Sequence, residues 1–280
     1  MNTKFISAFL VLALASLACG FNIDMPKMPT PGPEVTEEIV IPVPDTDEVS
    51  LKLSFGAGDM TLAPGAKEFV EGTATYNYDA FKPEVVVDGG DAQIKMSKVD
   101  SLPSFNDLKN EWDLKLGDTP MDLTIESGAY NGTFELGGLS LNNLTVQDGA
   151  ANVELTFSEP NLVEMSTFRY ETGASDVKMT GLANANFSLF DFSSGAGDYT
   201  LDFSGELQRD ASVTVSSGLS NIILVIPEGV NAVVTIDSGA SNVSVGSEWS
   251  QSGDIYKQKG EGPTLTIVIN IGAGNITLTK

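Results

Sequence analysis

The 280-residue sequence contains no histidine, a single cysteine and only two arginines. The lack of histidine excludes Ser–His triads, imidazole general bases and His-ligated zinc or iron. A lone cysteine, Cys19, excludes an intrachain disulfide and a thiolate metal cluster. The 15 basic residues are outnumbered by 38 acidic ones, and the resulting net charge of −23 repels phosphate backbones. We therefore expect no nucleic-acid partner.

The N-terminus, residues 1–19, has the features of an export signal. Lys4 precedes an apolar run over residues 5–17, which is shorter than the roughly 20 residues that a membrane-spanning helix needs. The run ends in the sequence SLACG at residues 16–20, which resembles a bacterial lipobox. Ser16 stands where lipoboxes usually carry leucine, and Ser16 with Ala18 also fits ordinary secretory cleavage. We predict that Cys19 carries a lipid that anchors the chain at the extracellular face of the cell membrane; the alternative is a secreted protein.

Residues 20–49 are rich in proline and acidic side chains, with Lys27 as the only basic residue. Prolines favour extended conformations and like charges keep a segment solvated, so this stretch predicts a stiff linker. The apolar patch over residues 39–43 can dock as an edge strand, because edge strands tolerate proline.

A short motif, Gly then Ala or Leu, a third residue and then Asp or Asn, recurs after residue 50, and alternating apolar residues flank each copy. The first and fourth residues of the copies are Gly56 and Asp59, Gly128 and Asn131, Gly149 and Asn152, Gly173 and Asp176, Gly195 and Asp198, Gly218 and Asn221, Gly239 and Asn242, and Gly272 and Asn275. From Gly128 to Gly239 the copies recur every 21 to 24 residues, which is typical of a solenoid.

We interpret each copy as the corner between two half-buried strands of one coil. Glycine would supply a backbone conformation closed to other residues, and the Asx side chain would bond the turn or a stacked neighbour. The fold class is therefore all-β, a single-chain β-solenoid of about 22-residue repeats. A run of hairpins forming an antiparallel β-sandwich is the alternative, since spacing alone does not separate the two. We assign residues 50–127 to an N-terminal capping part and residues 128–280 to the repetitive solenoid.

Three local features add predictions. Phe55 and Ile271 precede the first and last corner glycines, where the other copies carry polar residues, so we expect both to be covered. The Asp-Gly-Gly-Asp sequence at residues 88–91 looks like a degenerate corner. Trp249 and Tyr256 bracket an insertion that would either bind a partner or cap the C-terminal end.

Residues 112–116 (WDLKL) and 120–125 (PMDLTI), leading into Gly128, resemble the toast-rack family of bacterial envelope proteins. Residues 139–141 (LSL) and 144–146 (LTV), leading into Gly149, fit as well. The repeat is also similar to adhesin-like solenoids and to part of the cell-wall-active antibiotic response proteins. The resemblance implies an all-β, solenoid-like fold in an envelope setting over residues 50–280, and it implies no catalytic residues.

The chemistry of the side chains points away from catalysis. Asp59, Asp176 and Asp198 lie at corners and would suit calcium, but most corners carry asparagine, so we expect no cofactor. We predict a non-enzymatic envelope protein that presents a rigid surface for adhesion or scaffolding, with self-association or a protein or glycan surface as possible partners. The alternatives are a partner protein in envelope-stress signalling and, as a third option, a carbohydrate-active enzyme.

Overall fold

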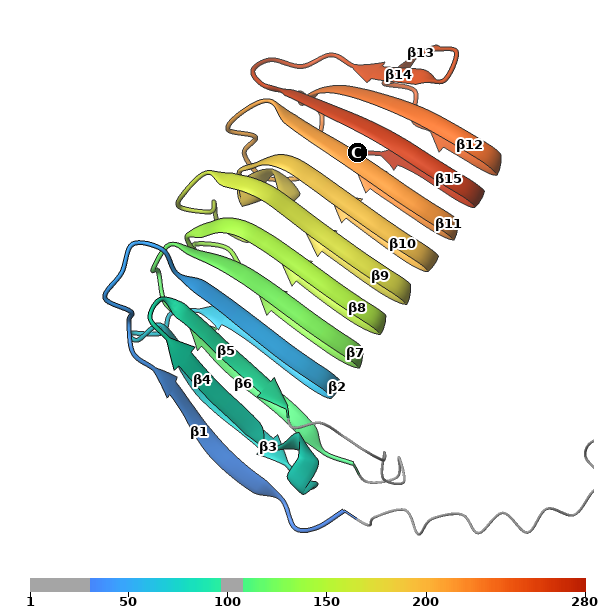
Figure 1. Ribbon diagram of the computed structural model, residues 1–280. Helices are drawn as coiled ribbons and strands as arrows, with labels where there is room; N and C mark the ends of the chain where they lie inside the picture. Colours follow the sequence, from blue (N-terminus) through green and yellow to red (C-terminus); the bar gives the residue numbers. More distant parts are fainter. Residues whose placement is uncertain (1–30, 97–107) are drawn as a thin grey trace, which may run out of the picture.

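The computed structural model describes residues 31–96 and 108–280. The predicted signal peptide, Cys19 and the first part of the linker lie outside these residues. The described chain is almost entirely β-structure in one sheet that bends back on itself coil after coil (Figure 1).

The elements are β1 (Val35–Ile41), β2 (Ser50–Pro64), β3 (Val70–Tyr76), the 3-10 helix η1 (Asp79–Phe81), β4 (Pro83–Asp88), β5 (Asp91–Met96), β6 (Asn110–Leu116), β7 (Met121–Glu135), β8 (Leu141–Thr156), β9 (Met165–Thr180), the 3-10 helix η2 (Leu182–Ala185), β10 (Phe187–Asp202), β11 (Ala211–Val225), β12 (Asn231–Val245), β13 (Ser250–Ser252), β14 (Ile255–Gln258) and β15 (Thr264–Thr279).

The eight long strands, which are β2, β7 to β12 and β15, each form one coil and pair in parallel with their neighbours. Parallel stacking in matched register identifies a solenoid, which confirms the predicted fold class over the sandwich alternative. The sequence predicts two strands per coil, whereas each coil is one strand of 15 or 16 residues bent at its corner. The matched register holds on both sides of the corner, where the ladders skip only the first corner glycine, or residues 149–151 between β8 and β9.

The coils do not stack in chain order at the C-terminal end. Strand β15 lies between β11 and β12 and pairs with both, so the last long strand fills a slot between two earlier ones (Figure 1). The β13–β14 hairpin then pairs with the outer edge of β12. Trp249 and Tyr256 are both buried there, so of the two roles predicted for this insertion the structure matches the C-terminal cap.

The N-terminal end divides into two short sheets. The first half of β2 pairs with β5, which pairs with β4, and the second half of β2 pairs with β6, which continues to β3 and β1. Strand β1 is an edge strand formed partly by residues 39–41, as predicted from their apolar character. The prediction of a corner at residues 88–91 is wrong, because this turn joins β4 and β5 in an antiparallel hairpin with Gly89 at φ 61°.

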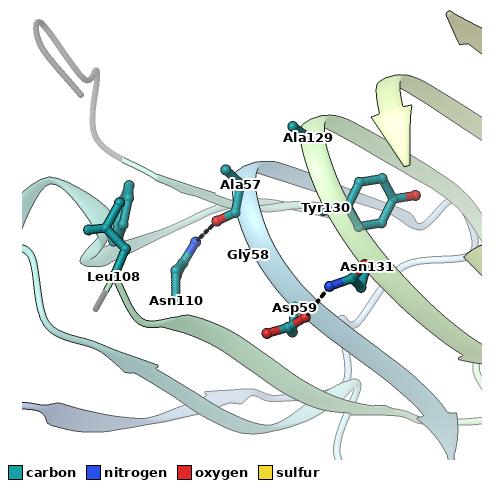
Figure 2. Close-up of a pocket in the computed structure, with 9 residues that line it drawn as sticks. Ala57, Gly58, Asp59, Leu108, Asn110, Ala129, Tyr130 and Asn131 are labelled. Carbon is teal, nitrogen blue, oxygen red and sulfur yellow. Dashed lines mark hydrogen bonds between the residues drawn. The ribbon is translucent and has the colours of Figure 1, made fainter. Parts of the chain in front are cut away.

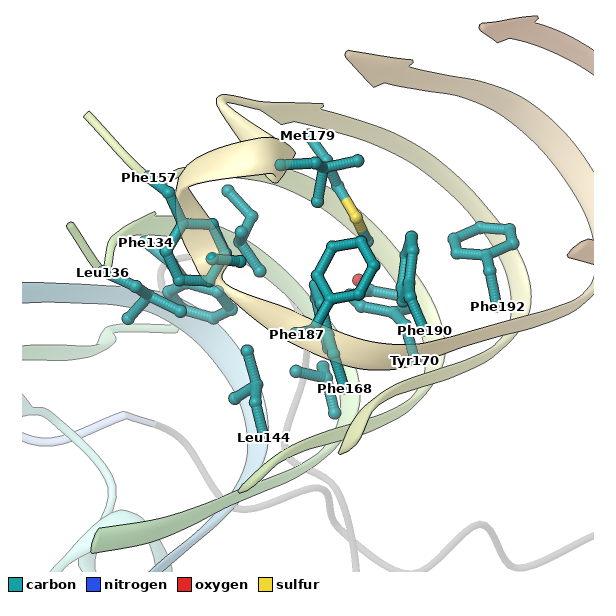
Figure 3. Packing of buried hydrophobic residues seen from close by; sticks show 14 of the residues in the cluster. Phe134, Leu136, Leu144, Phe157, Phe168, Tyr170, Met179, Phe187, Phe190 and Phe192 are labelled. Carbon is teal, nitrogen blue, oxygen red and sulfur yellow. The ribbon is translucent and has the colours of Figure 1, made fainter. Parts of the chain in front are cut away.

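The core fills the narrow space between the two sides of each coil, and equivalent side chains stack from coil to coil (Figure 3). Phe168 and Phe190 are register partners whose ring centroids lie 4.4 Å apart, and Tyr170 and Phe192 repeat the arrangement at 5.6 Å. Each such aromatic pair adds about 0.5–1.5 kcal/mol beyond its buried area. The stacked aromatics therefore fix the register of the central coils.

Phe55 and Ile271 are buried, at 1% and 4% exposure, as expected from their apolar character before a corner. Phe55 packs edge-on against Trp112, with 5.0 Å between the ring centroids, and Ile271 lies on β15 between the coils of β11 and β12. Neighbouring parts of the same chain supply this cover. The polar residues that precede the other corner glycines are not all more exposed to solvent than Phe55 and Ile271, since Thr172 is also buried.

Candidate functional site

The repeated corners form the most regular surface feature of the described chain. Parallel register places the eight first-position glycines in one column, and we call this set the glycine column. In spatial order it comprises Gly56, Gly128, Gly149, Gly173, Gly195, Gly218, Gly272 and Gly239. A Cβ added to Gly195 would lie 2.5 Å from the carbonyl oxygen of Gly173, and one on Gly218 would lie 2.6 Å from that of Gly195. Glycine is thus required at these corners because neighbouring backbones approach closely.

The close approach of neighbouring backbones, and not a special backbone conformation as predicted from the sequence, explains the first-position glycines. None of the first-position glycines is among the described residues with positive φ, so the prediction of a special backbone conformation is wrong there. Positive φ occurs instead at the third position, for example 132° at Gly58. The Asx residues likewise avoid the left-handed region.

The fourth positions form a second column, which we call the Asx ladder. In spatial order it comprises Asp59, Asn131, Asn152, Asp176, Asp198, Asn221, Asn275 and Asn242. At one end, Asn131 Nδ2 donates to Asp59 Oδ1 at 2.7 Å. Farther along, Asn221 donates to Asp198 at 2.6 Å, Asn275 to Asn221 at 2.6 Å and Asn242 to Asn275 at 3.2 Å. These bonds tie coils together, so the Asx side chains stabilise stacking.

A polar network inside one corner was not predicted from the sequence. The carboxylate of Asp148 accepts hydrogen bonds from the hydroxyl of Tyr170 at 2.8 Å, from Tyr130 at 3.5 Å and from Thr172. Ser175 donates to the same carboxylate and accepts the backbone N–H of Ala151. Burial, together with the negative charge of Asp148, holds the pKa of Tyr130 and of Tyr170 well above the ordinary tyrosine value. An acidic residue before the corner glycine was the only sequence signal for this cluster.

A concavity of about 370 Å³ lies beside the N-terminal end of the Asx ladder (Figure 2). It is lined by Ala57, Gly58, Asp59, Phe81, Leu108, Asn110, Ala129, Tyr130 and Asn131. Asn110 Nδ2 donates to the Ala57 carbonyl at 2.6 Å, while its buried Oδ1 has no hydrogen-bond partner among the described residues. The concavity thus combines an apolar wall with a few polar groups, as small-ligand sites do.

The outward side of the first half of each coil is a continuous sheet surface that we call the polar face. Its central row, in spatial order, comprises Lys52, Thr124, Thr145, Arg169, Asp191, Thr214, Val268 and Thr235. Side chains bond across the coils on this face, as in the pair of Lys52 and Glu126 at 2.7 Å and that of Gln147 and Glu171 at 2.9 Å. Seven coil spacings give this face a height of about 34 Å.

Within residues 31–96 and 108–280, no group of three or more acidic or cysteine side chains could hold a metal ion. The same part of the chain has no helix that is both long and apolar enough to cross a membrane. Cys19, the predicted lipidation site, lies outside it.

Together, the parallel coils, the glycine column and the Asx ladder define a two-sided β-solenoid with a corner built for stacking. Residues 30–167 match the family described as the N-terminal domain of toast_rack, DUF2154. Residues 30–167 therefore carry the N-terminal domain of the toast-rack family.

Comparison with solved structures returns proteins of similar length but low identity. A putative cell adhesion protein from Clostridium sporogenes is 18% identical, with 88% of this chain and 99% of that chain covered and a TM-score of 0.49. A putative adhesin from Bacteroides fragilis is 12% identical, with 88% and 97% covered and a TM-score of 0.36. A putative lipid binding protein from Parabacteroides distasonis is also 12% identical, with 89% and 98% covered and a TM-score of 0.36. No curated protein matches the sequence.

Proposed function

We propose that this protein is exported, is anchored to the extracellular face of the cell membrane through a lipid on Cys19, and presents its solenoid for adhesion or scaffolding without catalysis. The observation that carries the proposal is the polar face. Its rigidity follows from the parallel ladders that join neighbouring coils on both sides of the corner. It is also regular, because equivalent side chains recur at the strand spacing of about 4.8 Å.

Such a face is suited to extended partners such as a glycan or a protein surface. Its hydroxyl, amide and charged groups can bond a polar ligand at many points, and the backbone behind them does not need to be ordered on binding. The net charge of −23 keeps the protein soluble and separates copies of it at the cell surface. The acidic, proline-rich linker would hold the face away from the membrane.

Anchoring is tested by intact mass and detergent partitioning of the full chain from its own host, beside a Cys19→Ser variant. We expect a diacylglycerol mass increment on a chain that begins at Cys19, and release of the variant into the medium. An unmodified wild-type chain in the medium would refute lipidation and leave secretion.

Surface binding is tested by the adhesion of host cells that display the full chain to other cells and to purified envelope glycans. A Thr145→Glu, Thr214→Glu variant adds two charges to the centre of the polar face. The matched control, Thr133→Glu with Thr200→Glu, adds the same charge to outward positions on the other side of the coils. We expect at least tenfold weaker adhesion for the first variant only. Equal adhesion by both variants, at equal surface amounts, would refute a role for the polar face.

A further inference from the structure

The N-terminal end of the solenoid leaves two strands with a free edge. Among the described strands, β1 pairs only with β3, and β4 pairs only with β5. Strand β1 lies at the outer limit of the stack (Figure 1), and β4 ends the branch that runs from β2 through β5. A free edge presents unpaired N–H and C=O groups that can accept another strand.

Strand β4 also exposes apolar side chains on both of its faces. Val85, Val86 and Val87 are 42%, 40% and 50% exposed. Val85 lies opposite Ile94 and Val87 opposite Ala92, and both of these partners are buried. Because directly opposed residues share a face, Val85 and Val87 belong to the core side of the sheet but lack full cover.

The other ends of the molecule are protected against strand addition. Strand β1 carries Glu37 and Glu38 and leads into Pro42 and Pro44, features that discourage edge pairing. The C-terminal cap ends in β13, whose sequence is Ser-Gln-Ser. Strand β4 begins with Pro83 and carries Glu84 and Asp88, but its three central residues are all valine, so only its ends have such features.

The charges around β4 indicate what kind of strand can bind. Glu84 and Asp88 flank the valines, and Asp91 lies directly opposite Asp88 across the turn. Two basic groups lie near these acids in the described chain: Lys95, 3.5 Å from Glu84, and Lys82, which precedes the strand and pairs with Glu37 at 2.8 Å. In the antiparallel register that sets Val85 against Val87 of a second copy, Glu84 would face Asp88 of that copy, and like charges opposed across strands are destabilising. Together with the net charge of −23, this disfavours self-pairing.

We propose that β4 is a docking edge for an extended segment of a partner protein, one whose apolar centre is flanked by lysine or arginine. Main-chain hydrogen bonds extend the β2–β5–β4 sheet by one strand. The apolar side chains of the segment cover Val85 and Val87, and its basic ends meet Glu84 and Asp88. This is β-strand addition with charge selecting the partner.

The test uses the full chain and two synthetic peptides in which valine alternates with threonine, one with lysine and one with glutamate at both ends. Peptide binding is followed by fluorescence anisotropy, and amide hydrogen exchange locates the bound strand. We expect binding of the lysine peptide at least tenfold tighter than the glutamate peptide, with slowed exchange in β4. The charge reversal Glu84→Lys, Asp88→Lys should invert this preference.

The matched control is Glu159→Lys with Glu206→Lys, which changes the net charge equally at exposed positions outside both edge strands. It should retain the preference of the wild type, and so should the polar-face variant Thr145→Glu, Thr214→Glu, which separates this inference from the proposed function. Equal binding of the two peptides, or an unchanged preference after the reversal at β4, would overturn the proposal. A concentration-dependent dimer that protects β4 without peptide would overturn it in favour of self-pairing.

Discussion

The glycine column gives the sharpest stability prediction, through the substitution Gly195→Ala. The added Cβ would lie 2.5 Å from the carbonyl oxygen of Gly173, whereas ordinary van der Waals contact begins near 3.4 Å. Two paired backbones must therefore separate by several tenths of an ångström. Overpacking of this kind costs about 1–3 kcal/mol. The reduced entropy of the unfolded chain returns about 0.4–1 kcal/mol of that.

The net loss of roughly 1–2 kcal/mol corresponds to a Tm lower by about 2–8 °C for a protein of this size. Gly56→Ala is the matched control, because Gly56 ends the column and its added Cβ would meet only the flexible Met96 Cε at 3.0 Å. We expect little change in Tm for the control. Thermal melts followed by circular dichroism measure both variants. A Gly195→Ala protein as stable as the Gly56→Ala protein would refute the argument that close backbone approach selects glycine.

Two further predictions concern the corners. Asn221→Asp replaces the donor to Asp198 by a second carboxylate and should lower the free energy of unfolding by about 1 kcal/mol at neutral pH. In urea unfolding, adding Asp198→Asn should restore the lost stability. No recovery in the double variant would contradict a cross-coil hydrogen bond. Raised pKa values keep Tyr130 and Tyr170 neutral in the folded protein above pH 10, so their contribution to stability is full below the unfolded tyrosine pKa and is lost as pH rises beyond it. Tyrosine absorbance should therefore show a late, cooperative step on alkaline titration, which Tyr170→Phe reduces; a smooth titration of every tyrosine near pH 10 would contradict the network around Asp148.

Much of the fold was predictable from the sequence because the spacing of the repeat indicates how the coils stack. Parallel stacking brings equivalent positions together, so recurring glycine and Asx residues predict the two columns and the register between coils. Strand β6 and the edge strand β1 were also predictable from alternation and from proline. The reason why glycine is needed at the corner was not predictable from the sequence. A short repeat does not distinguish a required backbone angle from the close approach of a neighbouring coil.

Features without a repeat were out of reach of the same reasoning. The valines of β4 are a short apolar run, and only the structure reveals that no second described strand pairs with β4 beside β5. The network around Asp148 depends on Tyr130 and Tyr170, which come from the coils on either side of it. No local sequence pattern therefore predicts this network. Each of these features occurs once, so the sequence contains no second copy of it that would mark it as structurally important.

The position of β15 shows that a repeat predicts which positions of neighbouring coils contact each other better than it predicts the spatial order of the coils. Every copy of the corner motif carries glycine and Asx at the same two positions, so the motif alone does not specify the order in which the coils stack. The insertion between residues 246 and 263 is what lets the chain pass β12, form the β13–β14 hairpin and return. β15 then pairs with β11 on one edge and with β12 on the other. The final coil therefore holds the C-terminal cap to the stack, and the two ends differ in consequence: one is closed by the chain's own last strands, while the other keeps β4 open to a strand from elsewhere.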